Sequence, residues 1–316
     1  MREAVVTDAG DRIRWVELPG EEPCRAYVHG LGATSSAYFT EAAAHPLLAG
    51  RRSLLVDMLG HGISDRPTDF DYGLEAHADA LARALTAADV TGAELIAHSM
   101  GGSVGIVLAS RHPGLVRKLV LVDSNLDPLV PTHGVVGSNG IAAYSEEEFL
   151  AGGREEFAVL AGAQWWATMR LTGPEALYRS ARLAHGTRPT MRELLLDLKI
   201  PRTYLHPEAD GPVPGADTLT EAGVTVVPIP DCGHNVGSPT SPSPPKAPSM
   251  TSRSGTIPPL SFSWPRSPRP APGIVIARRR SLATPAPVSL STSSSTARKP
   301  RSRCSRSRLR TGTRRR

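Results

Sequence analysis

A serine stands between a strand-like run and an apolar helix-like run, and this junction constrains the fold more than any other feature. Residues 93–99 (AELIAHS) are typical of a buried strand, and residues 100–113 (MGGSVGIVLASRHP) are typical of a helix that ends at a proline. Ser99 lies at the junction, with Ala97 and Gly101 two positions away on either side. A sharp strand-to-helix turn strains its central residue and tolerates only small neighbours. The pattern predicts a turn that presents the Ser99 hydroxyl at a helix N-terminus, against the simpler interpretation of an ordinary turn bearing a stray serine.

Strand-like and helix-like segments alternate on both sides of this junction, with a repeat of roughly 30 residues. The strand-like runs are residues 25–30, 51–58, 93–99, 116–123, 200–207 and 224–230. Such alternation is typical of a mostly parallel sheet with helices on both faces. Residues 125–190 break the alternation, because they contain several helix-like segments without a strand between them. We therefore predict an α/β core formed by residues 1–124 and 191–236, with a helical cap inserted at 125–190.

Residues 237–316 differ from the rest of the chain in composition and charge. They hold 17 of the 36 Lys and Arg residues and no Asp or Glu, which gives them a formal charge of +17 and leaves residues 1–236 at −11. Ser, Pro and Arg dominate without a sustained apolar period, and such a segment cannot bury enough surface to form a core. We therefore predict a disordered basic tail. The high isoelectric point describes this tail and not the folded body.

Two hypotheses account for the tail. Its unopposed cations would bind polyanions non-specifically, although Phe262 and Trp264 are its only aromatic residues and no nucleic-acid-binding motif accompanies them, so no specific nucleic-acid partner is expected. The second hypothesis is a shift of the reading frame just after His234. Sequence rich in Arg, Pro, Ser and Ala, without Asp, Glu or Gln, is what a GC-rich gene gives out of register. The abrupt change at Gly237 favours this second hypothesis.

The remaining composition indicates a cytoplasmic protein. Three cysteines, Cys24, Cys232 and Cys304, are odd in number and far apart, which favours a reducing compartment and neither a disulfide framework nor a paired metal-binding motif. The first residues carry charges at short intervals and lack the apolar core of a signal peptide. No apolar run is long enough for a membrane span.

Three further motifs accompany the serine in a fixed order. They are HGLG (29–32), DMLGHGISDRP (57–67) and DCGHNV (231–236). The glycine-rich turn at 29–32 follows a strand, where the backbone N–H of Leu31 and that of Met100 can face one oxyanion. With AHSMGGSVG (97–105), these motifs make residues 10–236 resemble the α/β-hydrolase superfamily, in the branch that uses a serine nucleophile.

The resemblance implies a catalytic triad in the order serine, acid, histidine. It implies that Ser99 is the nucleophile and that His234, just after the last predicted strand, is the general base, with Gly233 supplying a tight turn. Asp210 is our first choice for the acid, because residues 204–210 resemble the family's strand ending that carries it. Asp123, at the end of the preceding strand in the sheet, and Glu208 remain as alternatives.

The resemblance also implies an activity and a pocket. The expected reaction is hydrolysis of a carboxylic ester or related acyl bond of a small molecule through an acyl-enzyme, with no cofactor and no metal. Trp165 and Trp166 in the cap are expected to line the substrate pocket. A carbon–carbon bond hydrolase, a lactonase and a perhydrolase remain open within the superfamily. Outside it, the alternatives are a non-enzymatic polyanion-binding protein and an inactive, frameshifted hydrolase.

Overall fold

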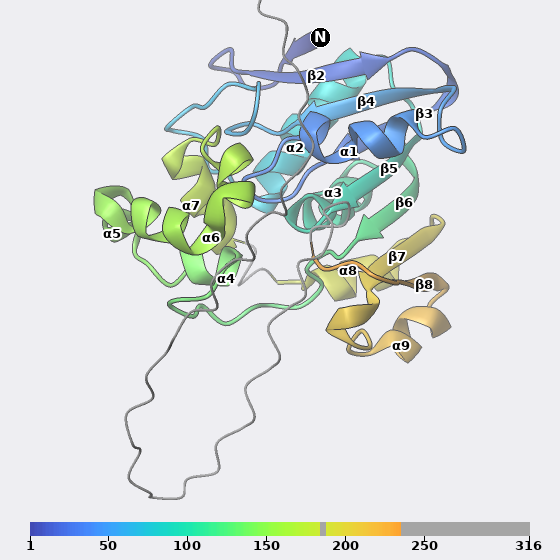
Figure 1. Ribbon diagram of the computed structural model, residues 1–316. Coiled ribbons are helices and arrows are strands. Elements are labelled where there is room, and N and C mark those ends of the chain that lie inside the picture. Colours follow the sequence, from blue (N-terminus) through green and yellow to red (C-terminus); the bar gives the residue numbers. More distant parts are fainter. Residues whose placement is uncertain (184–187, 235–316) are drawn as a thin grey trace, which may run out of the picture. The chain divides into compact units, whose positions relative to one another are not determined.

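The computed structural model describes residues 1–183 and 188–234, which are built on one sheet (Figure 1). Its strands are β1 (Arg2–Val5), β2 (Arg12–Leu18), β3 (Glu21–Val28), β4 (Arg51–Asp57), β5 (Ala93–His98), β6 (Val116–Val122), β7 (Arg202–Pro207) and β8 (Val224–Ile229). They lie in the order β1-β2-β4-β3-β5-β6-β7-β8. Strand β2 is antiparallel to β1 and β4, and all other neighbours are parallel. The predicted mostly parallel sheet is confirmed, and the tail predicted at 237–316 lies outside the described residues.

Helices cover both faces of the sheet, as predicted. Successive strand side chains point to opposite faces, so Leu54 and Val56 of β4 join one buried cluster and Leu55 joins another. Helix α1 (Ser35–Ala44) packs on the Leu55 side. Helices α2 (Leu74–Ala87), α3 (Met100–Arg111) and α8 (Met191–Asp197) pack together on the other side, and α9 (Ala216–Glu221) contacts β8. Since both faces are apolar, this two-sided cover is what the strand sequences require.

The chain between β6 and α8 is helical, as the broken alternation at 125–190 indicates. It contains α4 (Ser138–Ile141), α5 (Glu146–Glu148), the π-helical turn η1 (Phe149–Gly153), α6 (Arg154–Met169) and α7 (Pro174–Leu183). Phe149, Phe157 and Tyr178 are almost fully buried and belong to the same apolar cluster as the sheet. The inserted helices therefore pack onto the core, while the division of the chain into core and cap domains stays a prediction.

In the described part of the chain, no helix has the length and apolar character that a membrane span needs.

Candidate active site

Ser99 occupies the strained turn that the sequence predicts. Its φ of 50° and ψ of −122° place it directly between β5 and α3, as the N-cap of that helix. The turn is tight because a Cβ built on Gly101 would lie 2.3 Å from the backbone carbonyl oxygen of His29. The Ser99 side chain thus stands at the positive end of the helix dipole, where free amides can stabilise developing negative charge.

His234 and Asp123 form a hydrogen-bonded pair. The distance from His234 Nδ1 to Asp123 Oδ2 is 2.5 Å. A carboxylate can only accept, so Nδ1 carries the hydrogen and Nε2 keeps its lone pair. Asp123 is the first residue after β6, and its backbone N–H donates to the carbonyl of Leu205 in β7 at 2.8 Å. This bond fixes Asp123 at the carboxyl ends of two neighbouring parallel strands.

Asp210, our first choice for the acid, does not occupy this position. It is exposed and ends η2 (Glu208–Asp210), a 3₁₀ turn that follows β7, and among the described residues it makes no hydrogen bond to His234. Glu208 is exposed at the start of the same turn. The physical reason is the length of β7. This strand continues to Pro207, so the turn that follows it lies beyond the end of β6. The structure pairs the alternative acid, Asp123, with His234.

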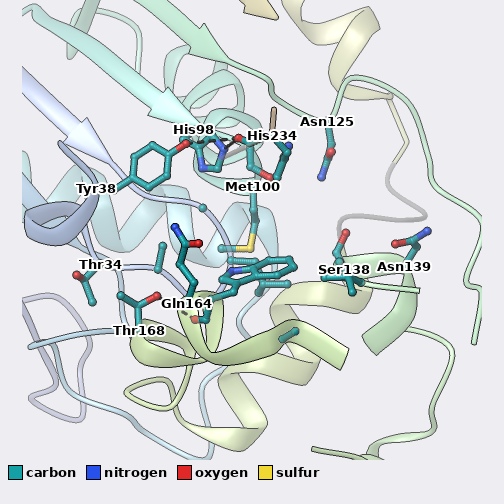
Figure 2. Close-up of a pocket in the computed structure, with 18 of the residues that line it drawn as sticks. Thr34, Tyr38, His98, Met100, Asn125, Ser138, Asn139, Gln164, Thr168 and His234 are labelled. Atoms are coloured by element: carbon teal, nitrogen blue, oxygen red, sulfur yellow. Dashed lines mark hydrogen bonds between the residues drawn. The ribbon is translucent and has the colours of Figure 1, made fainter. Parts of the chain in front are cut away.

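Ser99 and His234 line one cavity of about 690 Å³ (Figure 2). Within the part of the chain that the structure describes, the Ser99 hydroxyl and the His234 ring do not form a hydrogen bond. Such bonds are often long in an enzyme without substrate and tighten in the complex. The cavity therefore brings the predicted nucleophile and the predicted base to one space without aligning them.

The two residues expected to supply the oxyanion amides, Leu31 and Met100, also line this cavity. Met100 is the first residue of α3, so its N–H has no intrahelical acceptor. The loop at Leu31 abuts the serine turn, since a Cβ on Gly30 would lie 2.8 Å from His98 Nδ1 and 3.1 Å from Ser99 Cβ. The arrangement is compatible with an oxyanion hole, whose assignment remains a prediction.

His98 connects the serine turn to the His234 loop, a role that the sequence did not indicate. Its Nε2 lies 2.8 Å from the backbone carbonyl oxygen of His234, and its ring stacks on that of Tyr38 with centroids 4.4 Å apart (Figure 2). Burial lowers the pKa of His98 to about 3. The ring is therefore neutral near pH 7, and Nε2 carries the hydrogen, because a carbonyl only accepts.

The two tryptophans of α6 have different positions. Trp165 lines the cavity, as expected. Trp166 does not: the guanidinium carbon of Arg154 lies 5.0 Å from the centre of its ring, in a cation–π contact. Neighbours on a helix point about 100° apart, so only one of the pair faces the cavity. The prediction that Trp166 lines the pocket is therefore not supported by the structure.

The loop at 57–67 has structural bonds. The carboxylate of Asp57 accepts the backbone N–H of Ser35 at 2.7 Å and that of Ile63 at 3.0 Å, while Asp65 pairs with Arg14 at 2.6 Å. These bonds tie the loop to α1 and β2. Across the described ranges, His, Cys, Asp and Glu side chains form no cluster that could hold a metal ion.

Comparison with known proteins identifies the family of this chain. A family model described as alpha/beta hydrolase fold matches residues 27–210, more than half of the chain. The chain belongs to this α/β-hydrolase family.

The individual relatives match only a part of the chain. A 2-hydroxymuconate semialdehyde hydrolase from Pseudomonas sp. (strain CF600) is 39% identical over 98 residues, which are 31% of this chain and 35% of that protein. A probable lysophospholipase, BODYGUARD 4, from Arabidopsis thaliana is 30% identical over 37% of this chain and 28% of its own length. The matches thus span only about a third of these relatives.

Solved structures share the fold. An enol-lactonase from Burkholderia xenovorans LB400 superimposes with a TM-score of 0.57 at 22% identity, covering 74% of this chain and 93% of its own. An esterase from Exiguobacterium antarcticum gives a TM-score of 0.57 at 19% identity, over 73% and 91%. At this level of identity the likeness shows the fold alone.

Proposed function

We propose that this hydrolase cleaves a carboxylic ester or related acyl bond of a small molecule through an acyl-enzyme formed on Ser99. The observation that carries the proposal is the 2.5 Å hydrogen bond between His234 and Asp123, beside a cavity that contains the strained Ser99 turn. A serine, a histidine with a free Nε2 and a half-buried carboxylate are the three groups that nucleophilic acyl transfer needs.

The mechanism follows from the roles of these groups. Asp123 holds the hydrogen of His234 on Nδ1, so Nε2 accepts the proton of Ser99 as its oxygen attacks the carbonyl carbon. The N–H groups of Leu31 and Met100 stabilise the oxyanion. His234 then returns the proton to the leaving oxygen. A water molecule repeats the attack on the acyl-enzyme and releases the acid and free Ser99.

A fluorophosphonate probe and a p-nitrophenyl ester test the proposal together. The full chain should be labelled and should release p-nitrophenol, whereas Ser99→Ala should lose labelling and about 10⁴-fold or more in kcat. Circular dichroism would establish that the variant keeps the fold. Ester hydrolysis that persists undiminished in pure, folded Ser99→Ala protein would refute the nucleophile.

The other functions that the sequence allows are also proposals. Lactone or carbon–carbon bond hydrolysis would use the same three groups, and an enol-lactonase is among the chain's structural neighbours. Polyanion binding through residues 237–316 concerns a segment outside the described residues. A cytoplasmic location rests on the sparse cysteines, of which Cys24 and Cys232 are free and buried.

A further inference from the structure

Three polar side chains face the cavity without hydrogen-bond partners among the described residues. Asn125 follows Asp123 by two positions, while Ser138 and Asn139 begin α4 of the inserted helices. All three are half-buried. Figure 2 shows them grouped on one side of the cavity, with Thr34, Gln164 and Thr168 on the other side. Core and insertion therefore jointly present two amides and a hydroxyl beside the catalytic pair.

The described lining of this cavity carries no Lys, Arg, Asp or Glu. Its histidines are His98, which burial keeps neutral near pH 7, and the catalytic His234. The nearby acids Asp123 and Asp127 are engaged with His234 and Arg192. A substrate carboxylate would thus lose its hydration without gaining an ion pair from these residues, which is costly.

An aliphatic substrate would also be a poor match on this side of the cavity. By covering Asn125, Ser138 and Asn139 it would displace water from two amides and a hydroxyl and leave them unpaired. A substrate oxygen that accepts or exchanges hydrogen bonds with them avoids this loss. Sites built to hydrogen-bond a substrate group reject analogues that lack the group. Leu129, Val136 and Trp165 supply apolar lining for the intervening hydrocarbon.

We propose that Asn125, Ser138 and Asn139 select an uncharged ester or lactone that carries a second oxygen function, a ketone, hydroxyl or amide, a few carbons from the scissile carbonyl. The inference rests on the proposed serine-hydrolase function and specifies its substrate class. It assigns the three residues to specificity and leaves bond cleavage to Ser99, His234 and Asp123.

Three methyl esters of similar length test the proposal: methyl pentanoate, methyl 4-oxopentanoate and monomethyl succinate. They place a methylene, a ketone or a carboxylate at the same distance from the ester, and hydrolysis by the full chain is followed by acid release at constant pH. We expect kcat/KM for the ketone to exceed that for the alkane about 10-fold, as one or two hydrogen bonds would provide. The succinate should be the poorest substrate.

Variants assign the preference to residues. Asn125→Leu and Asn139→Leu, which keep the number and branching of the side-chain heavy atoms, should each lower the ketone-to-alkane ratio of kcat/KM about 3- to 10-fold. Thr168→Val is the matched control, because the Thr168 hydroxyl already donates to the backbone carbonyl of Trp165 and is not free for substrate. It should leave the ratio unchanged.

The outcomes separate this inference from the proposed function. If esters are cleaved in a Ser99-dependent manner but monomethyl succinate is as good a substrate as the ketone, the substrate class is wrong and the mechanism stands. A ratio that is the same in wild type and both Asn variants would likewise overturn the assignment. If Ser99 neither reacts with the fluorophosphonate nor supports hydrolysis of any ester, the proposed function itself fails.

Discussion

The ring of His98 donates a hydrogen bond to the backbone carbonyl of His234, across 136 positions of sequence and a distance of 2.8 Å. This bond joins the residue before the proposed nucleophile to the proposed base. Tyr38 supports it from α1 by stacking on His98. The Tyr38 hydroxyl also donates to this carbonyl, at 3.5 Å. His234 is therefore held at its ring by Asp123 and at its carbonyl by His98 and Tyr38. Base placement within about half an ångström governs catalytic efficiency.

We predict that His98→Phe lowers kcat about 10- to 100-fold with little change in KM, because it keeps a stacking ring but removes the donor to His234. His98→Gln, whose amide nitrogen can reach the same carbonyl, should recover most of the loss. In a His234→Ala background, His98→Phe should have no further effect on residual turnover. A further loss in that background would show that His98 acts on the Ser99 turn instead.

A second prediction concerns the acid. Asp123→Asn should lower kcat about 10⁴-fold, because an amide can donate to Nδ1 and thereby favours the tautomer in which Nε2 carries the hydrogen. Asp210→Asn, at an exposed turn, should stay within about 2-fold of wild type. Steady-state kinetics on both proteins under one set of conditions decides the matter. The assignment to Asp123 fails if the Asp210 variant is the inactive one.

The choice between Asp123 and Asp210 shows what the sequence could not predict. The positions of Ser99 and His234 could be predicted because they depend on residues adjacent in sequence, the small neighbours of the turn and the end of the last strand. The acid depends on how far β6 and β7 extend beside each other, which is a property of the assembled sheet. Secondary-structure boundaries are the least predictable feature of a sequence.

The inserted helices show the same limit. Their helical character could be predicted from composition, but not which of Trp165 and Trp166 faces the cavity. Helix α6 is interrupted at Gly162, where φ is 73° and ψ is 167°, so the helical phase does not carry through from its first residues. The selectivity residues Asn125, Ser138 and Asn139 gave no sequence signal, because only the fold brings them together.

A third prediction compares two glycines that flank the catalytic residues. Gly101→Ala should lower both the melting temperature and kcat, by about 100-fold for kcat, since its methyl would lie 2.3 Å from the carbonyl oxygen of His29. Gly233→Ala should be tolerated, because no described atom lies within 4 Å of the position that its methyl would take and its φ is not positive. In the turn before His234, the residue with a positive φ is Asp231, at 54°. Thermal melts and ester kinetics check both variants; equal damage from the two would contradict the packing argument.

Three buried histidines, His29, His61 and His77, form a row. The ring centres of His29 and His61 lie 5.0 Å apart, and those of His61 and His77 lie 6.1 Å apart. Burial lowers the pKa of His29 to about 4 and that of His61 to about 3, and it lowers the pKa of His77 well below 6.5. His61 Nε2 and His77 Nδ1 have no hydrogen-bond partner within the described ranges. His61 Nδ1 lies 3.0 Å from the backbone carbonyl oxygen of Leu59, a bond that favours the charged ring, but the cost of burial outweighs it.

The last prediction is a loss of stability in mild acid. Between about pH 6.5 and pH 4 the unfolded chain binds protons at these histidines and the folded chain does not, so the free energy of unfolding falls as pH falls. Each buried ring contributes a slope of up to about 1.4 kcal/mol per pH unit. These three and His98, whose pKa burial also lowers to about 3, together contribute up to about 5.5 kcal/mol per pH unit. Urea denaturation at pH 7.5, 6 and 5 measures the slope. His77→Phe, among the aromatic rings of Phe70 and Tyr72, should lower it by about one quarter, because four buried histidines contribute to the slope. Tyr72→Phe is the matched control: it removes a buried 2.6 Å hydrogen bond to the carbonyl of Pro67, so it should reduce stability at every pH without changing the slope. A His77→Phe protein with the wild-type slope would show that burial of this ring does not set the acid sensitivity.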